Sequence, residues 1–129
     1  MANQFVVQLK NEPGAMANLA EKLAARGVDL RAIGGGGIGG VGHVIMTTAD
    51  DDTTRHILEE DAYTFVEGES IIAEVDDRPG GMARIARQLA DAGVNILGHL
   101  FLGRWGDRAM FAFVVDKPEV ARPILERKG

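Results

Sequence analysis

Residues 5–30, FVVQLKNEPGAMANLAEKLAARGVDL, return as residues 71–96, IIAEVDDRPGGMARIARQLADAGVNI, so one stretch of sequence occurs twice. The copies are offset by 66 positions without a gap, and nine positions are identical. Each copy reads as a short β-rich run, a Pro-Gly turn and a helix with apolar residues at i, i+3, i+4 and i+7. Gly27 and Gly93 follow where helix C-caps are expected. The sequence therefore predicts an internal duplication of a strand, a turn and a helix.

The first copy is predicted to continue with further elements. Asp50 suits the N-cap of a second helix, because its carboxylate can accept from the first backbone amides. A glycine-rich piece, GGGGIGGVG, covers residues 34–42 and is expected as a flexible strand or a hairpin. The predicted order is a strand, a helix, two strands, a helix and a strand: residues 5–10, 13–26, 28–33, 44–48, a helix from 50, and 62–66. Residues 67–70 are expected to link to the second copy.

The second copy is predicted to repeat this order without its last strand. Pro118 suits the first turn of a final helix, whereas Pro123 removes an interior hydrogen bond and should kink or shorten that helix. The segment Gly103–Asp107 is expected to be the turn between the two middle strands. The expected elements are a strand at 71–75, a helix at 79–92, strands at 94–102 and 108–115, and a helix at 118–127.

The order βαββαβ is that of a ferredoxin-like sandwich, an antiparallel sheet with both helices on one face. The chain is thus predicted to be α+β, with two tandem units over residues 1–68 and 69–129. The missing strand should leave the edge at Ile71–Val75 uncovered unless another segment fills it. Exposed strand edges invite pairing with another chain, which favours a homo-oligomer, most simply a dimer.

The composition argues against nucleic acid and membranes as binding partners. The net charge of -5 argues against nucleic acid, whose binding depends on clustered Lys and Arg. No stretch approaches the roughly 18 apolar residues of a membrane span, and the first ten residues do not resemble a signal peptide. The absence of cysteine fits a reducing compartment. A cytoplasmic protein that binds neither nucleic acid nor membrane is expected.

The segments NEPGAM at Asn11–Met16 and DRPGGM at Asp77–Met82, with GVDL and GVNI after each helix, resemble the ACT domain family. The resemblance covers almost the whole chain as two copies, the second incomplete. It implies domains that pair side by side and bind a free amino acid where the first turn of one meets the second strand of its neighbour. It also implies a free-standing tandem protein, regulatory rather than enzymatic and without a cofactor.

Two other functions remain open. The chain could be a regulatory subunit that docks on an amino-acid biosynthetic enzyme and gives it feedback control. It could also be a small enzyme with a metal held by histidines and carboxylates, although no nucleophile–base pair or metal-ligand spacing supports this.

The Pro-Gly turns suit an amino acid, because helix N-termini offer free amide donors to a carboxylate. Asn11 and Asp77 can accept from the ammonium group. The alternative is that these two residues are ordinary N-caps and that the glycines only shape a turn. The candidate ligand residues of the turns are Asn11, Pro13, Gly14, Ala15 and Met16 in the first copy and Asp77, Arg78, Pro79, Gly80, Gly81 and Met82 in the second.

The two turns differ in charge, since Glu12 stands in the first where Arg78 stands in the second. Arg78 attracts a carboxylate and Glu12 repels it, so the main site is expected at Asp77–Met82. In the first copy the bare glycines at 34–37 could instead let a ligand pack against backbone.

The resemblance adds His99, Leu100 and Phe101 on the following strand, whose register the sequence leaves open. The methionines of the turns are also candidates for the core.

Two further patterns are discounted. Gly34, Gly36 and Gly39 match G-x-G-x-x-G, but a strand rather than a helix is predicted to follow, which argues against a dinucleotide site. His43 and His56 have no partner at the spacing of a metal site on a helix, and both are expected to be surface or hydrogen-bonded histidines.

Overall fold

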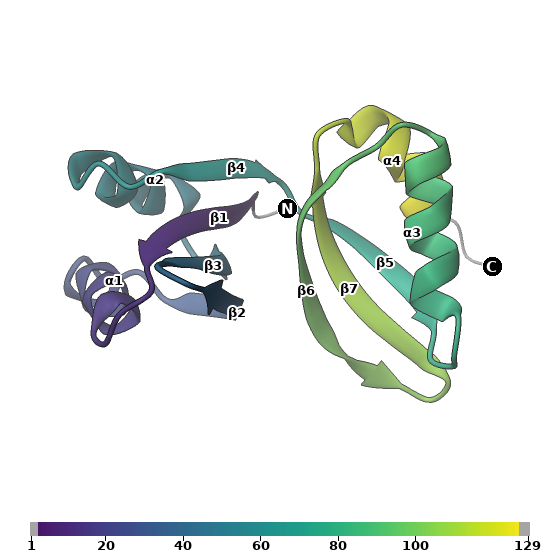
Figure 1. The fold of residues 1–129 in the computed structure, drawn as a ribbon, viewed down its shortest axis with the longest axis horizontal. Helices are drawn as coiled ribbons and strands as arrows, with labels where there is room; N and C mark the ends of the chain where they lie inside the picture. Colours follow the sequence, from purple (N-terminus) through teal and green to yellow (C-terminus); the bar gives the residue numbers. More distant parts are fainter. Residues whose placement is uncertain (1–2, 127–129) are drawn as a thin grey trace. The chain divides into compact units, whose positions relative to one another are not determined.

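The computed structural model describes residues 3–126 of the protein. The chain divides into two compact units, Met1–Gly68 and Glu69–Gly129, and each is described by itself. Both units are α+β, with two helices packed on one sheet (Figure 1). No helix within residues 3–126 is long and apolar enough to cross a membrane.

Unit 1 has the predicted ferredoxin-like order. Its sheet has the strand order β2-β3-β1-β4, and β3 pairs antiparallel with both β1 and β2. Asp50 caps the second helix by accepting from the Thr53 amide at 3.0 Å, as predicted. The elements are β1 Asn3–Lys10, α1 Ala15–Ala25, β2 Leu30–Ile38, β3 Val41–Thr48, α2 Asp51–Glu60 and β4 Phe65–Glu69.

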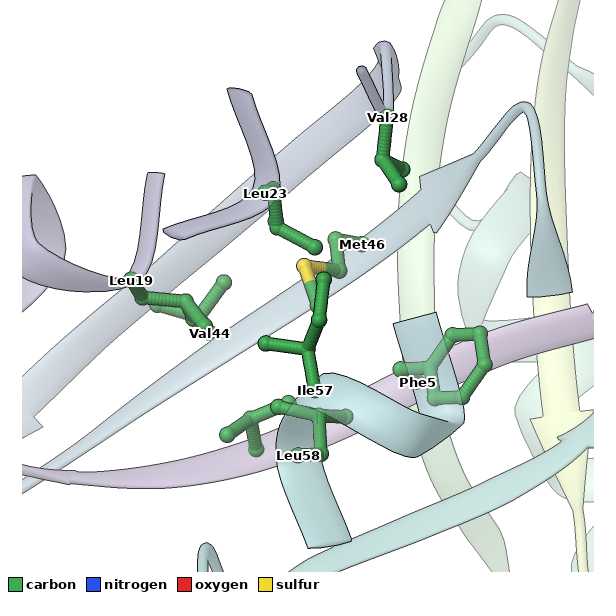
Figure 2. Close-up of a cluster of buried hydrophobic side chains, with 9 residues drawn as sticks. Phe5, Leu19, Leu23, Val28, Val44, Met46, Ile57 and Leu58 are labelled. Atoms are coloured by element: carbon green, nitrogen blue, oxygen red, sulfur yellow. The ribbon is translucent and has the colours of Figure 1, made fainter. Parts of the chain in front are cut away.

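The core of unit 1 lies between the sheet and the two helices. Alternate residues of β1 and β3 face the helices, because successive side chains of a strand point to opposite faces. Burying each large apolar side chain contributes about 1.5–3 kcal/mol. Figure 2 shows side chains from α1 and α2 meeting those of the strands, namely Phe5, Val44 and Met46 from the sheet, Leu19 and Leu23 from α1, Ile57 and Leu58 from α2, and Val28 after α1.

The described part of unit 2, residues 69–126, contains no strand after α4, as predicted. Its described sheet has three strands in the order β5-β7-β6, and α3 and α4 cover one face of it. The final helix is only eight residues long and contains Pro123. The predicted end of that helix at Arg127 lies outside the described residues. The elements are β5 Ile71–Asp76, α3 Gly81–Asp91, β6 Ile96–Trp105, β7 Arg108–Val115 and α4 Pro118–Leu125.

The outer edge of β5 corresponds to the edge of β1 that β4 covers in unit 1. There the Gln8 amide donates to the Thr64 carbonyl at 2.9 Å. Glu74 occupies the position of Gln8, since it pairs with Met110 as Gln8 pairs with His43. Within residues 3–126 no strand lies on that side of β5.

The prediction of the fourth strand at 62–66 is wrong by several residues, because the strand begins at Phe65. Ala62 and Tyr63 instead form the C-terminal cap that follows α2. Ala62 adopts a left-handed φ of 56°, and the Tyr63 amide donates to the Leu58 carbonyl at 2.9 Å. Gly27 and Val28 end α1 in the same way, so an alanine occupies the place that glycine usually takes in this C-cap.

The predicted turn at Gly103–Asp107 is also too long. Strand β6 continues to Trp105, and only Gly106 and Asp107 connect it to β7. The pairing with β7 shifts between Phe101 and Gly103, so this glycine lies in a β-bulge rather than in the turn.

Candidate ligand site at the Pro-Gly turns

Both Pro-Gly turns place glycine at the helix N-cap. Gly14 has φ 89° and Gly80 has φ 90°, the left-handed region that other residues adopt only at a cost. Neither helix has a side-chain cap, so the alternative that Asn11 and Asp77 serve as N-caps is wrong.

The amide donors at the two helix starts are only partly free. The Ala15 amide donates to the Glu12 carbonyl at 3.3 Å, and the Gly81 amide donates to the Arg78 carbonyl at 3.1 Å. These two amides, expected to face a ligand, are therefore used inside the turn. The following amides, of Met16 in α1 and Met82 in α3, have no acceptor within their helices by the geometry of a helix start.

Asn11 and Asp77 have the same backbone contacts but different side-chain partners. The backbone amide of Asn11 donates to the Gly40 carbonyl at 3.1 Å, and the backbone amide of Asp77 donates to the Asp107 carbonyl at 2.8 Å. The Asn11 side-chain nitrogen donates to the Gly39 carbonyl at 2.9 Å. Its carboxamide oxygen is left for another donor. The Asp77 carboxylate instead forms an ion pair with a guanidinium group.

That guanidinium belongs to Arg104, whose Nε lies 2.8 Å from Asp77 Oδ2. Arg104 was missed from sequence, because residues 103–107 were predicted to be a turn and Asp77 is distant along the chain. Its position is matched by strand pairing: Arg104 pairs with Ala109 as Gly37 pairs with Gly42 in unit 1. An added Cβ at Gly37 of β2 would lie 2.7 Å from the Asn11 side chain, so a side chain at this position would have to displace that of Asn11.

The bulge in β6 changes which residues of unit 2 are equivalent to those of unit 1. Gly35 pairs with Val44 in unit 1 as Phe101 pairs with Phe111 in unit 2. Leu102 is then left out of the pairing, and β2 has no such irregularity at that point. The offset between equivalent residues is therefore 66 before Leu102 and 67 after it.

A cavity of about 320 Å³ lies at the first turn. Its apolar wall consists of Leu9, Met16, Ile33 and Val44, and backbone of the glycines at 34–36 forms one side. The polar residues that line it are Lys10, Asn11, Glu12 and His43. Two of the five candidate residues of this turn, Pro13 and Gly14, do not line it, whereas Asn11, Ala15 and Met16 do.

A cavity of about 350 Å³ lies at the matching place in unit 2. Its wall includes four candidate residues, Asp77, Arg78, Pro79 and Met82. Gly80 and Gly81 do not line it. The remaining lining residues are Val75, Asp76, Arg104, Ala109 and Phe111.

The two cavities differ where the second and third strands meet. The rings of Phe101 and Phe111 lie 5.5 Å apart between centroids, at the places of Gly35 and Val44. The Arg104 guanidinium lies 4.7 Å from the centroid of Phe101. Aromatic rings and a paired guanidinium thus occupy in unit 2 a region that bare backbone borders in unit 1.

The three candidate ligand residues on β6 lie on different faces of the sheet. Leu100 is buried, with 4% of its surface exposed, whereas Phe101 is 49% exposed. His99 is exposed and pairs with Phe113, on the same face as Phe101 and Phe111. None of the three lines the cavity of unit 2 described above.

Histidines and metal ligands do not gather in the described part of the chain. His43, His56 and His99 are all exposed. No group of three or more His, Asp or Glu side chains within residues 3–126 could hold a metal ion.

Similarity to known proteins is found in the fold and not in the sequence. The sequence matches no protein-family model and no curated protein. Among solved structures, a protein from Bacteroides thetaiotaomicron has a TM-score of 0.71 at 18% identity, over 97% of this chain and 86% of that one. The regulatory subunit of aspartate kinase from Thermus thermophilus, in its ligand-free form, has a TM-score of 0.60 at 18% identity, over 97% and 91%.

A third structure agrees, the regulatory subunit of aspartate kinase from Thermus flavus, with a TM-score of 0.60 at 18% identity over 97% of this chain and 90% of that one. The agreement spans both units, because nearly all of each chain is covered. The protein therefore has the tandem ferredoxin-like fold expected from its ACT resemblance, the fold that these aspartate kinase regulatory subunits share.

Proposed function

We propose that this protein is a non-enzymatic regulatory protein that binds a free amino acid at its Pro-Gly turns. The observation that carries the proposal is the cavity of unit 1, which combines an apolar wall with groups of both charges. An amino acid needs an acceptor for its ammonium, a donor for its carboxylate and a place for its side chain. The lining of this cavity offers all three.

The roles in unit 1 follow from the chemistry of the lining. Lys10 and the Met16 amide are donors for the carboxylate. Glu12 and the carboxamide oxygen of Asn11 are acceptors for the ammonium. The space against Val44 and the glycine backbone receives the side chain of the ligand.

Unit 2 is the second candidate site, with Arg78 as the carboxylate receptor and Asp77 as the ammonium acceptor. Here the Asp77 carboxylate is already paired with Arg104 at 2.8 Å. A ligand ammonium must therefore compete with a guanidinium for it. His99 and Phe101 are proposed to contact the ligand from β6, on the face where Phe111 lines the cavity.

The test is a thermal-shift screen against the twenty amino acids, followed by calorimetric titration of those that stabilise the protein. A ligand at about 100 times its Kd stabilises the fold by about 2.7 kcal/mol. Asn11→Ala should weaken binding in unit 1. Asn18→Ala is the matched control, because Asn18 is an exposed asparagine on α1, the helix that follows the turn, and does not line the cavity.

A comparison of Asp77→Ala with Asn11→Ala determines which unit binds the amino acid. A loss of affinity in Asp77→Ala alone places the ligand in unit 2, and a loss in Asn11→Ala alone places it in unit 1. No stabilisation by any amino acid would contradict the proposal.

A second function is favoured by the comparisons, in which the similar structures are regulatory subunits of aspartate kinase. In this reading the chain docks on an amino-acid biosynthetic enzyme and controls it by feedback. The test is to purify the chain from its source cells and to measure the activity of any enzyme that co-purifies, with and without the chain. An enzyme whose amino-acid inhibition requires the chain would establish this function.

We also propose that the protein forms a homodimer in which the open edge of β5 takes part. The support is that β4 covers the matching edge in unit 1, whereas no described strand covers β5. Light scattering coupled to size-exclusion chromatography measures the oligomeric state directly.

A further inference from the structure

We propose that unit 2 contains a second binding site, for a doubly charged tetrahedral oxyanion such as sulfate or phosphate, at the guanidinium groups around Asp76. Three arginines share this carboxylate. Arg108 donates to one oxygen, Oδ1. The other, Oδ2, lies 3.3 Å from Arg78 and 3.6 Å from Arg84.

The charges of this cluster do not balance. Asp76 faces three guanidiniums, which leaves two positive charges in excess before the nearby Glu74 carboxylate is counted and one after it, within a protein of net charge -5. The distances from Arg78 and Arg84 exceed the roughly 2.7–2.9 Å of a good charge-assisted hydrogen bond. Each guanidinium has five donors, so both have donors free for a further anion.

The cluster is not a requirement of the fold. In unit 1 the matching positions hold Lys10, Glu12, Asn18 and Val41, and no ion pair joins them. The first turn of α3 also has no acidic side chain to offset the added positive charge of Arg84. The arginines of unit 2 therefore gather where the same fold works without them.

A small cavity adjoins the cluster. It has a volume of about 140 Å³ and lies between the end of β5, α3 and α4. Arg84 and Arg108 line it, together with the side chain of Gln88 one helical turn after Arg84. This volume is less than half that of the cavity at either Pro-Gly turn, which suits a single oxyanion group.

One group opposes the anion, since Glu74 lines the same cavity as Asp76. A singly charged ligand would gain little against two carboxylates. Three guanidiniums against two carboxylates leave one positive charge in excess, so a dianion gains about twice the net attraction of a monoanion. The planar fork of arginine also matches the oxygen spacing of sulfate or phosphate. The expected ligand is therefore a tetrahedral dianion, and removal of the Glu74 charge should strengthen its binding.

The test is calorimetric titration of the full chain with sodium sulfate and then sodium phosphate, at an ionic strength held constant with sodium chloride. We expect Arg84→Gln to lower sulfate affinity by about tenfold or more. Arg87→Gln is the matched control, because Arg87 is an exposed arginine on the same helix that lies near Asp91 rather than Asp76. Glu74→Gln should raise the affinity.

Three results would overturn the proposal: sulfate that binds no better than chloride, an equal loss in Arg84→Gln and Arg87→Gln, or malonate that binds more tightly than sulfate. Circular dichroism of both arginine variants verifies that the fold is retained. Arg78 and Asp76 also line the Pro-Gly cavity of unit 2, whereas Arg84 lines neither Pro-Gly cavity, so a loss of sulfate binding in Arg84→Gln with unchanged amino-acid binding separates the two sites.

Discussion

Arg104 and Asp77 form an ion pair in unit 2, with Nε 2.8 Å from Oδ2, at the positions that Gly37 and Asn11 occupy in unit 1. In unit 1 the side chain of Asn11 fills the space beside Gly37 and keeps an oxygen free. In unit 2 the acceptor is already occupied by a cation. The proposed ammonium acceptor of the duplicated turn is therefore available in unit 1 and paired with a cation in unit 2.

Replacing Arg104 with Ala should free the Asp77 carboxylate, so amino-acid affinity in unit 2 should increase. The pair is exposed, at 63% for Arg104 and 31% for Asp77, so its loss should lower the free energy of unfolding by less than about 1 kcal/mol. Titration calorimetry measures the first effect and urea unfolding the second. A weaker amino-acid affinity in the variant would show that Arg104 contributes to the site instead of blocking it.

The left-handed glycines of the turns should not tolerate a side chain. Gly14→Ala and Gly80→Ala should each cost about 1–2 kcal/mol in unfolding free energy, because their φ angles are 89° and 90°. Gly40→Ala is the control, since an added Cβ there meets nothing and its φ is not left-handed. Urea denaturation of the three variants is the measurement, and equal losses in all three would contradict the assignment of the cost to the backbone angle.

Stability should fall in acid partly through Glu67. The hydrogen bonds from Arg55, and then from Asn3, lower the pKa of this carboxyl below its ordinary value of 4.5. A lowered folded pKa gives stability that is present above 4.5 and is lost as the pH falls through the folded value.

Glu67→Gln should therefore reduce the loss of stability between about pH 5 and pH 3. Urea unfolding across that range is the measurement. Glu119→Gln provides a control carboxylate on α4, in unit 2. A pH dependence that is unchanged in Glu67→Gln would count against the role of this ion pair.

The open edge of β5 can be blocked with little damage to the sheet. Glu74→Pro removes the amide that corresponds to that of Gln8, which points to β4 in unit 1. Proline is tolerated on an edge strand where the missing amide faces away from the ladder. If dimers form through this edge, light scattering should show monomers for Glu74→Pro and dimers for Glu74→Gln.

Most of the fold could be predicted from the repeat, because a strand, a Pro-Gly turn and an apolar helical face occur twice at one spacing. That no strand follows α4 up to residue 126 was predicted in the same way. The start of β4 could not be predicted, because the cap that ends α2 has Ala62 in the left-handed conformation. A glycine usually occupies this position and would have indicated the end of the helix. Its apolar residues at 62–66 look extended when read alone.

The candidate site was predicted only as far as the local motif extends. Asn11, Met16, Asp77 and Met82 were named because they lie in the turns, and all four line cavities there. Arg104 and Arg108, which pair with Asp77 and Asp76, come from other strands. Their proximity depends on strand register, and a single bulge residue changes that register without a visible mark in the sequence.

The bulge at Leu102 also limits how the two units can be exchanged. A chimera that grafts the β2–β3 hairpin of unit 1 into unit 2 with one fixed spacing would misplace every residue after that point by one. Since neighbouring strand residues point to opposite faces, the misplaced residues would present their core side chains to the wrong side. Deletion of Leu102 is therefore the first step of any such design, and it converts two unequal hairpins into interchangeable parts.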